Sequence, residues 1–177
     1  MDFVIEPAYH RLDSIRELFT EYTEALGLDL AFQGFAEELA ALPGKYAGPD
    51  GRLYLASLDG EAAGCIALRR FDAECCEMKR LYVRDKFRGR SLARRLAGLV
   101  IADARAAGYR YMLLDTMRSM RAAGSLYASL GFVEVEPYYH NPFDAVFYRL
   151  DLAGTSTGSQ SKSARQVSLS GQSGQRS

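Results

Sequence analysis

The positively charged segment at residues 84–95 contains the residues best suited to binding an anion. It holds six Lys or Arg residues and one acidic residue, and it follows an apolar run at residues 81–83. Apolar residues then recur at helical spacing: Leu92, Leu96, Leu99 and Val100. A strand that leads through a glycine-containing turn into a helix leaves backbone N–H groups free, and the helix dipole favours negative charge there. The pattern therefore predicts that residues 88–95 bind a phosphate or diphosphate.

Two common phosphate-binding motifs do not account for this turn. No Gly-Lys-Ser/Thr follows a four-residue spacer, as a Walker loop requires. Two of the three glycines of the dinucleotide fingerprint are also missing.

Residues 88–93, Arg-Gly-Arg-Ser-Leu-Ala, instead resemble the acyl-CoA diphosphate turn R/Q-x-x-G-x-G/A of the GNAT N-acetyltransferase family. Residues 77–83 resemble the central strand of that family, and residues 123–132 resemble its A-x-x-L-Y-x-x-x-G-F helix and turn. These motifs span roughly residues 60–150 in the family order. The sequence departs from the pattern at Ser91, where glycine is usual, and at Met120, where asparagine is common.

The resemblance implies how acetyl-CoA would bind. In the family the central strand bulges and separates from its parallel neighbour, here after Val83, and the pantetheine arm inserts like an extra strand. By position, the backbone of Leu81 would face the thioester carbonyl and that of Val83 the pantetheine. The diphosphate turn would consist of Arg88, Gly89, Arg90, Ser91, Leu92 and Ala93, and Met120 would border the same site.

The resemblance also implies catalytic and acceptor-binding residues. Tyr127 is the candidate general acid, because a phenol stays protonated at neutral pH and can donate to the leaving thiolate; packing beside Leu126 is its alternative role. Glu77 is the candidate base, with a structural ion pair as its alternative, and His140 or a water molecule could take the proton instead. The acceptor pocket would be bordered by Phe32, Tyr138 and His140.

Periodicity and turn residues predict the elements that position these residues. Strands are expected at residues 3–5, 52–58, 62–71, 77–83, 111–114, 132–135 and 145–150, and helices at residues 13–27, 35–42, 92–107 and 120–130. The stretch from 77 to 114 predicts a parallel crossover in a mostly antiparallel sheet. The expected fold class is α/β (α+β): one domain at residues 1–152, with a mixed sheet of about six to seven strands and about four helices.

Composition narrows the classes of function. Residues 153–177 hold three basic residues and no acidic one, so the remainder of the chain has 19 basic and 22 acidic residues, which is no nucleic-acid-binding signature. This segment is rich in Ser, Gly and Gln and is predicted to be a disordered tail. No apolar run is long enough for a membrane span, and the three cysteines with no nearby histidine favour reduced thiols and no metal site. We expect a cytoplasmic protein.

The leading hypothesis is an acetyl-CoA-dependent N-acetyltransferase that acts on a primary amine of a small molecule, an amino-acid-like substrate or a peptide. A non-catalytic acyl-CoA-binding module is the alternative, motivated by Ser91 and Met120. A homodimer is left open.

Overall fold

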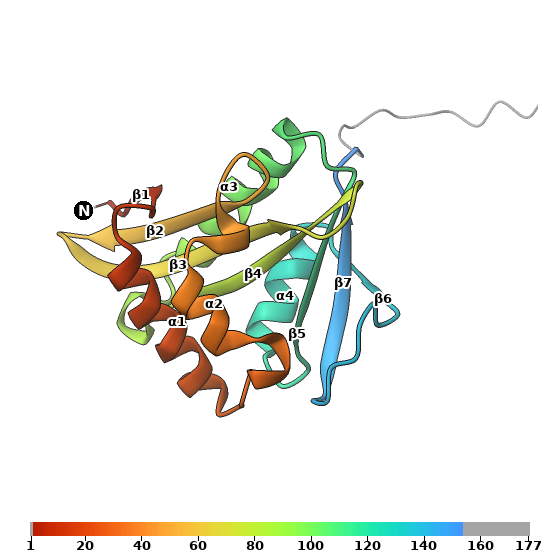
Figure 1. Ribbon diagram of the computed structural model, residues 1–177, viewed down its shortest axis with the longest axis horizontal. Helices are drawn as coiled ribbons and strands as arrows, with labels where there is room; N and C mark the ends of the chain where they lie inside the picture. The colour runs from red at the N-terminus through yellow and green to blue at the C-terminus, as the bar shows by residue number, and fades with distance from the viewer. Residues whose placement is uncertain (1, 154–177) are drawn as a thin grey trace, which may run out of the picture.

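The structure is a computed structural model that describes residues 2–153. In this range seven strands form one sheet in the order β1-β2-β3-β4-β5-β7-β6 (Figure 1). The strands are β1 (Val4–Pro7), β2 (Arg52–Leu58), β3 (Glu61–Arg70), β4 (Cys75–Val83), β5 (Tyr111–Met117), β6 (Val133–Val135) and β7 (Ala145–Asp151). The helices are α1 (Leu12–Leu26), α2 (Phe35–Ala41), α3 (Leu92–Ala106) and α4 (Arg121–Ser129), with short 3-10 turns η1 (Ala31–Gln33), η2 (Gly44–Tyr46) and η3 (Asp85–Phe87). Apart from Ala153, the expected tail lies outside the described residues.

The strand pairing confirms the predicted fold class. Neighbouring strands are antiparallel except β4 and β5, which are parallel and joined through α3. A parallel pair needs a long crossover, and a helix that packs on the sheet supplies it. Among the described helices, none is both long and apolar enough to cross a membrane.

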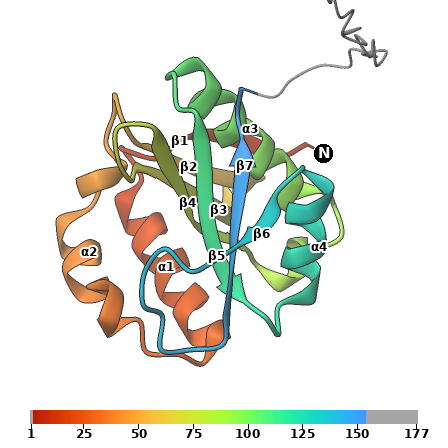
Figure 2. The ribbon, with the colours of Figure 1, turned by 90° about the vertical axis from the view of Figure 1, so that its right-hand side faces the viewer.

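Helices cover both faces of the sheet, with α1 and α2 on one side and α3 and α4 on the other (Figure 2). Helix α3 buries one stripe of side chains: Leu92, Leu96, Ala97, Val100, Ile101 and Ala104. Leu99, expected in this stripe, is only half-buried. On the other face α1 buries Ile15, Leu18 and Phe19. Each large buried side chain contributes about 1.5–3 kcal/mol, so these two stripes fix both layers against the sheet.

The differences from the predicted elements are small and local. Strand β1 runs to Pro7. Proline has no backbone N–H to donate, and this is tolerated because β1 lies at the edge of the sheet. Helix α1 begins at Leu12, with Arg11 as its N-cap, instead of at Asp13 or Ser14. The 3-10 turns were not predicted, because three residues are too few to show a period.

Candidate functional site

The largest groove opens where β4 and β5 part. The two strands pair only from Cys75 to Glu77 on β4 and from Tyr111 to Leu113 on β5. Beyond this point they diverge, and a groove of about 1020 Å³ runs between them to the first turns of α3 and α4. We expected the separation after Val83, but it begins six residues earlier, after Glu77.

A β-bulge in β4 changes which side chains face this region. Cys65 pairs with Tyr82 and Ala67 with Lys79, so Ile66 alone faces two residues of β4. These two residues are Arg80 and Leu81, and Arg80 has a φ of 59°. Consecutive side chains of a regular strand point to opposite faces, but an extra residue shifts the alternation. Lys79 and Arg80 therefore both lie on the α1/α2 side, where both border the same cavity.

The turn that we predicted to bind an anion connects β4 to α3. Gly89 and Ser91 have φ values of 76° and 60°, and α3 begins at Leu92 with no side-chain cap at Ser91. The first N–H groups of α3 therefore have no partner within the helix and lie beside the groove. The backbone at Ser91 is left-handed, a conformation that glycine adopts most easily. This explains why the resembled motif usually has glycine at this position.

The arginines of this turn differ in their placement. Arg88 lines the groove, donates from Nε to the Val83 carbonyl at 3.1 Å and pairs with Asp85 at 2.9 Å. Arg90 does not line the groove in the described residues, whereas Arg94, which we did not single out, does. Of the predicted donor-binding residues, the groove brings together Leu81, Val83, Arg88, Gly89, Ser91, Leu92, Ala93 and Met120.

Tyr127 of α4 lines the same groove from its inner wall. Its ring packs on Phe132 and Tyr148, with centroids 5.7 and 6.1 Å away. The Tyr127 hydroxyl makes no hydrogen bond within residues 2–153. Ser57 Oγ is the one polar side-chain atom in this range that is both unpaired and inaccessible to solvent, so the unpaired Tyr127 hydroxyl is accessible to solvent. Burial raises the pKa of Tyr127 above its ordinary value of 10.0, so the phenol is protonated at neutral pH.

Glu77 has a different environment from the one expected of a catalytic base. Its side chain is 1% exposed and lines none of the three hollows described here. One carboxylate oxygen accepts from Arg69 Nε at 2.8 Å, and the other accepts from the Tyr138 hydroxyl at 2.6 Å. Because Arg69 is the direct cross-strand partner of Glu77, the pair is fixed by the register of β3 and β4. This geometry is a structural ion pair, as in the alternative that we gave, but its closest partner is Arg69, where we expected Arg80 or Lys79.

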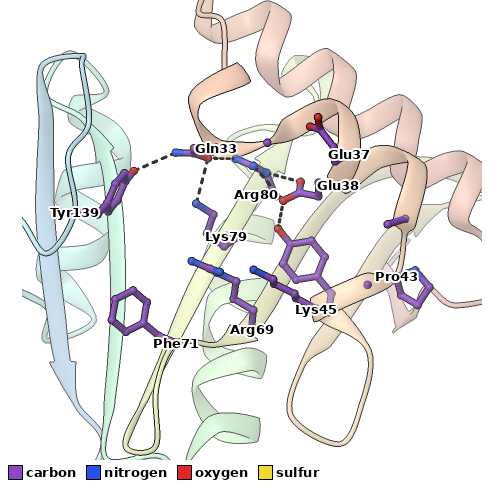
Figure 3. A pocket seen from close by; sticks show the side chains of 14 residues that line it. Gln33, Glu37, Glu38, Pro43, Lys45, Arg69, Phe71, Lys79, Arg80 and Tyr139 are labelled. Atoms are coloured by element: carbon purple, nitrogen blue, oxygen red, sulfur yellow. Dashed lines mark hydrogen bonds and ion pairs between the residues drawn. The ribbon is translucent and has the colours of Figure 1, made fainter.

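A second cavity, of about 560 Å³, lies on the α1/α2 side of the sheet (Figure 3). The Gln33 amide is central to it: Oε1 accepts from Lys79 at 3.2 Å and Arg80 at 3.0 Å, and Nε2 donates to the Tyr139 hydroxyl at 3.1 Å. Arg80 also donates to Glu38 of α2 at 2.9 Å. The cavity is therefore walled by residues of η1, α2, η2, β3, β4 and the loop before β7.

A third hollow, of about 40 Å³, shares lining residues with both the cavity and the groove, and we call it the channel. Lys79 and Arg80 line all three hollows, and Asp115 of β5 lines the channel and the groove. Asp115 Oδ2 accepts from Asn141 Nδ2 at 3.0 Å and from the Tyr139 hydroxyl. The Asp115 carboxylate thus borders the channel and the groove, but not the cavity.

The loop after β6 contributes a different residue from the ones expected. Tyr139 lines the cavity, whereas Tyr138 packs on Phe71 and Phe147 and bonds to Glu77. His140 is exposed and lines none of the three hollows. Phe32 lies in η1, but its side chain is outside the described part of the structure.

Sequence reasoning missed Asp115, Lys79 and Arg80 as site residues. The available signal was the Lys79-Arg80 pair inside a strand that is otherwise mostly apolar, since charged residues in a central strand need a reason to be there.

The comparisons with known proteins agree with one another. A sequence model of the Acetyltransferase (GNAT) family matches residues 12–132. An uncharacterized N-acetyltransferase of Schizosaccharomyces pombe is 43% identical over 145 residues, covering 80% of this chain and 89% of that protein. One from Dictyostelium discoideum is 34% identical over 211 residues, covering 84% and 98%.

Solved structures share the architecture. A GNAT-family acetyltransferase from Staphylococcus aureus has a TM-score of 0.72 at 21% identity, covering 85% of this chain and 99% of its own. An acetyltransferase from Salmonella typhimurium, crystallised with acetyl-CoA, has a TM-score of 0.61 at 22% identity, covering 85% and 94%. At these identities the likeness concerns the fold.

Proposed function

The chain belongs to the acetyltransferase (GNAT) family, and from this premise we propose that it transfers the acetyl group of acetyl-CoA to a primary amine of a small or amino-acid-like molecule. The observation that carries the proposal is the groove between β4 and β5. It begins at the free N–H groups of α3 and passes the unpaired hydroxyl of Tyr127. In this proposal the amine of the acceptor reaches the groove by way of the channel at Asp115, from a separate cavity large enough for a small acceptor.

The donor would lie along the groove. The N–H groups of residues 92–94 and the cations Arg88 and Arg94 suit a diphosphate, because unpaired helix-start amides and guanidinium groups both favour phosphate oxygens. The backbone of residues 81–83, left without a partner strand on the β5 side, offers hydrogen bonds to the amides of a pantetheine arm.

The reaction needs a proton acceptor for the amine and a hydrogen-bond donor for the leaving thiolate, and we assign one side chain to each role. The amine nitrogen forms a bond to the thioester carbonyl carbon, the carbon–sulfur bond breaks, and the electron pair leaves with sulfur. Tyr127 donates a hydrogen bond to the departing sulfur, and a phenol of raised pKa suits this better than complete proton release.

Asp115 is the proposed proton acceptor, directly or through a water molecule. Its carboxylate borders the channel through which the amine would approach, and it also attracts the ammonium form. Tyr139 and Asn141 hold the carboxylate in place through hydrogen bonds. Glu77, which is saturated by Arg69 and Tyr138, holds the acceptor-side cations in place instead.

The test is release of free thiol from acetyl-CoA in the presence of a panel of primary amines, with the acetylated product identified by mass spectrometry. We expect amine-dependent thiol release and one acetyl group added per product. Binding of acetyl-CoA by calorimetry with no turnover on any amine would contradict the enzymatic proposal. It would favour the non-catalytic acyl-CoA-binding module.

A further inference from the structure

We propose that the acceptor is an amino acid whose carboxylate binds between Lys79 and Arg69 in the 560 Å³ cavity, while its amine enters the channel toward Asp115. This inference rests on the proposed function and names the substrate class of the same site.

The first observation is an imbalance of charge at the cavity floor. Arg80 is paired with Glu38, so that cation is neutralised within the protein. Arg69 and Lys79 both face the single carboxylate of Glu77, at 2.8 and 3.9 Å. One further negative charge is needed to balance this floor, and a bound carboxylate supplies it.

The acids that border the cavity do not remove this imbalance. Glu38 is paired with Arg80, and the charge of Glu37 is offset by Lys45, a cation that borders the same cavity. Asp115 borders the channel and the groove but not the cavity. Lys45 offsets Glu37 in charge only, since it forms no ion pair within residues 2–153.

The second observation is the placement of Lys79. Its side chain is only 9% exposed, and its closest polar partner is the neutral amide oxygen of Gln33, at 3.2 Å. Figure 3 shows the nitrogen ends of Lys45, Arg69 and Lys79 pointing toward the same part of the cavity from three different elements. Burying a cation that must share one carboxylate, Glu77 at 3.9 Å, with Arg69 is unfavourable in the free protein, and burial lowers the pKa of Lys79. Binding a carboxylate there relieves this cost.

The third observation is that the charges differ along the path. The cations Arg69 and Lys45 border the cavity alone, and the Asp115 carboxylate borders the channel and the groove but not the cavity. Lys79 and Arg80 border all three. A molecule with a carboxylate at one end and an amine at the other matches this order. It would present the amine to the groove, where acetyl transfer takes place.

The experiment compares acceptors that differ only by the carboxylate. Pairs of an amino acid and its decarboxylated amine, such as alanine with ethylamine and phenylalanine with phenethylamine, are assayed with acetyl-CoA. We expect kcat/KM at least tenfold higher for the carboxylate member of the preferred pair. Equal values within every pair would overturn the inference and leave the acetyltransferase proposal intact.

The variant Lys79→Met removes the proposed binding charge and keeps a straight apolar stem. It should abolish the preference for the amino acid over its amine while leaving the melting temperature unchanged or higher, because an uncompensated buried cation is lost. Lys86→Met is the matched control: Lys86 pairs with Glu61 and lines none of the three hollows, so the preference should remain. A preference that survives in Lys79→Met would contradict the inference.

A binding measurement makes the test independent of turnover. Calorimetry with the CoA-loaded protein compares an N-acetylamino acid, the expected product, with its primary amide, which lacks the negative charge. We expect at least tenfold tighter binding of the acid, and this difference should vanish in Lys79→Met. Equal binding of acid and amide across the panel would overturn the carboxylate site whether or not any amine is acetylated.

Discussion

Removing one oxygen atom from Tyr127 separates its role in turnover from its role in packing. In the structure the ring packs on Phe132 and Tyr148, while the hydroxyl borders the groove and has no hydrogen-bond partner in the described residues. Tyr127→Phe therefore keeps the packing and removes only the donor. A hydrogen bond to a charged group contributes about 1.5–3 kcal/mol, which corresponds to a fall in kcat of about 10- to 150-fold.

The assay is steady-state thiol release at varied acetyl-CoA concentration, together with urea unfolding. We expect kcat to fall by this factor, the KM for acetyl-CoA to change less than about threefold, and the free energy of unfolding to stay within about 1 kcal/mol. Tyr148→Phe is the matched control, since it removes a hydroxyl from the neighbouring ring, which lines none of the three hollows. If kcat is unchanged in Tyr127→Phe, or falls only in proportion to lost stability, the phenol has no part in the chemistry.

Five further variants test other parts of the structure. Glu77→Gln should lower the free energy of unfolding, measured with urea, by about 2–4 kcal/mol, because it breaks a buried ion pair. Asp115→Asn should lower kcat at least about tenfold with little loss of stability. The reverse pattern would identify Glu77 as the base. Hydrogen bonds from Arg84 lower the pKa of Glu21 below its ordinary value of 4.5, so this carboxylate stabilises the fold above that pH and the contribution is lost as pH falls through the lowered pKa. Glu21→Gln should thus be less stable than the parent at about pH 7, and the difference should shrink at about pH 3; an equal difference at both would exclude this linkage. Ser91→Val should weaken acetyl-CoA binding measured by calorimetry, because a β-branched residue in the left-handed region costs about 1–3 kcal/mol, while Ser91→Gly should bind at least as well as the parent.

The donor side of the site could be predicted from the sequence because its geometry is local. Unpaired N–H groups come together wherever a strand leads through a turn, here with Gly89, into a helix, here from Leu92. This arrangement does not depend on the rest of the fold. The prediction that Tyr127 lies in the same groove as this turn needed the family resemblance. The separation of β4 from β5 was expected too late in the strand, because sequence periodicity does not reveal where two strands stop pairing.

The acceptor side could not be predicted because its residues come together only through tertiary contacts. Arg69 neutralises Glu77 across two strands, which turns an apparent base into part of an ion pair. Tyr138 and Tyr139 are adjacent and chemically equal in sequence, yet they bond to different carboxylates, Glu77 and Asp115. Which of two such neighbours faces a cavity depends on the loop conformation, and sequence pattern does not specify this.

The extra residue at Arg80 has a consequence for how β4 can evolve. It divides the strand into two stretches with opposite phase, so that Lys79 and Arg80 contact the acceptor side while Leu81 and Val83 belong to the core under α3. Deleting this one residue would turn the last three side chains of the strand to the opposite faces of the sheet, and the ring of Tyr82 would move from the α1/α2 side to the α3 side. The strand therefore tolerates exchanges of side chain far better than any change in its length.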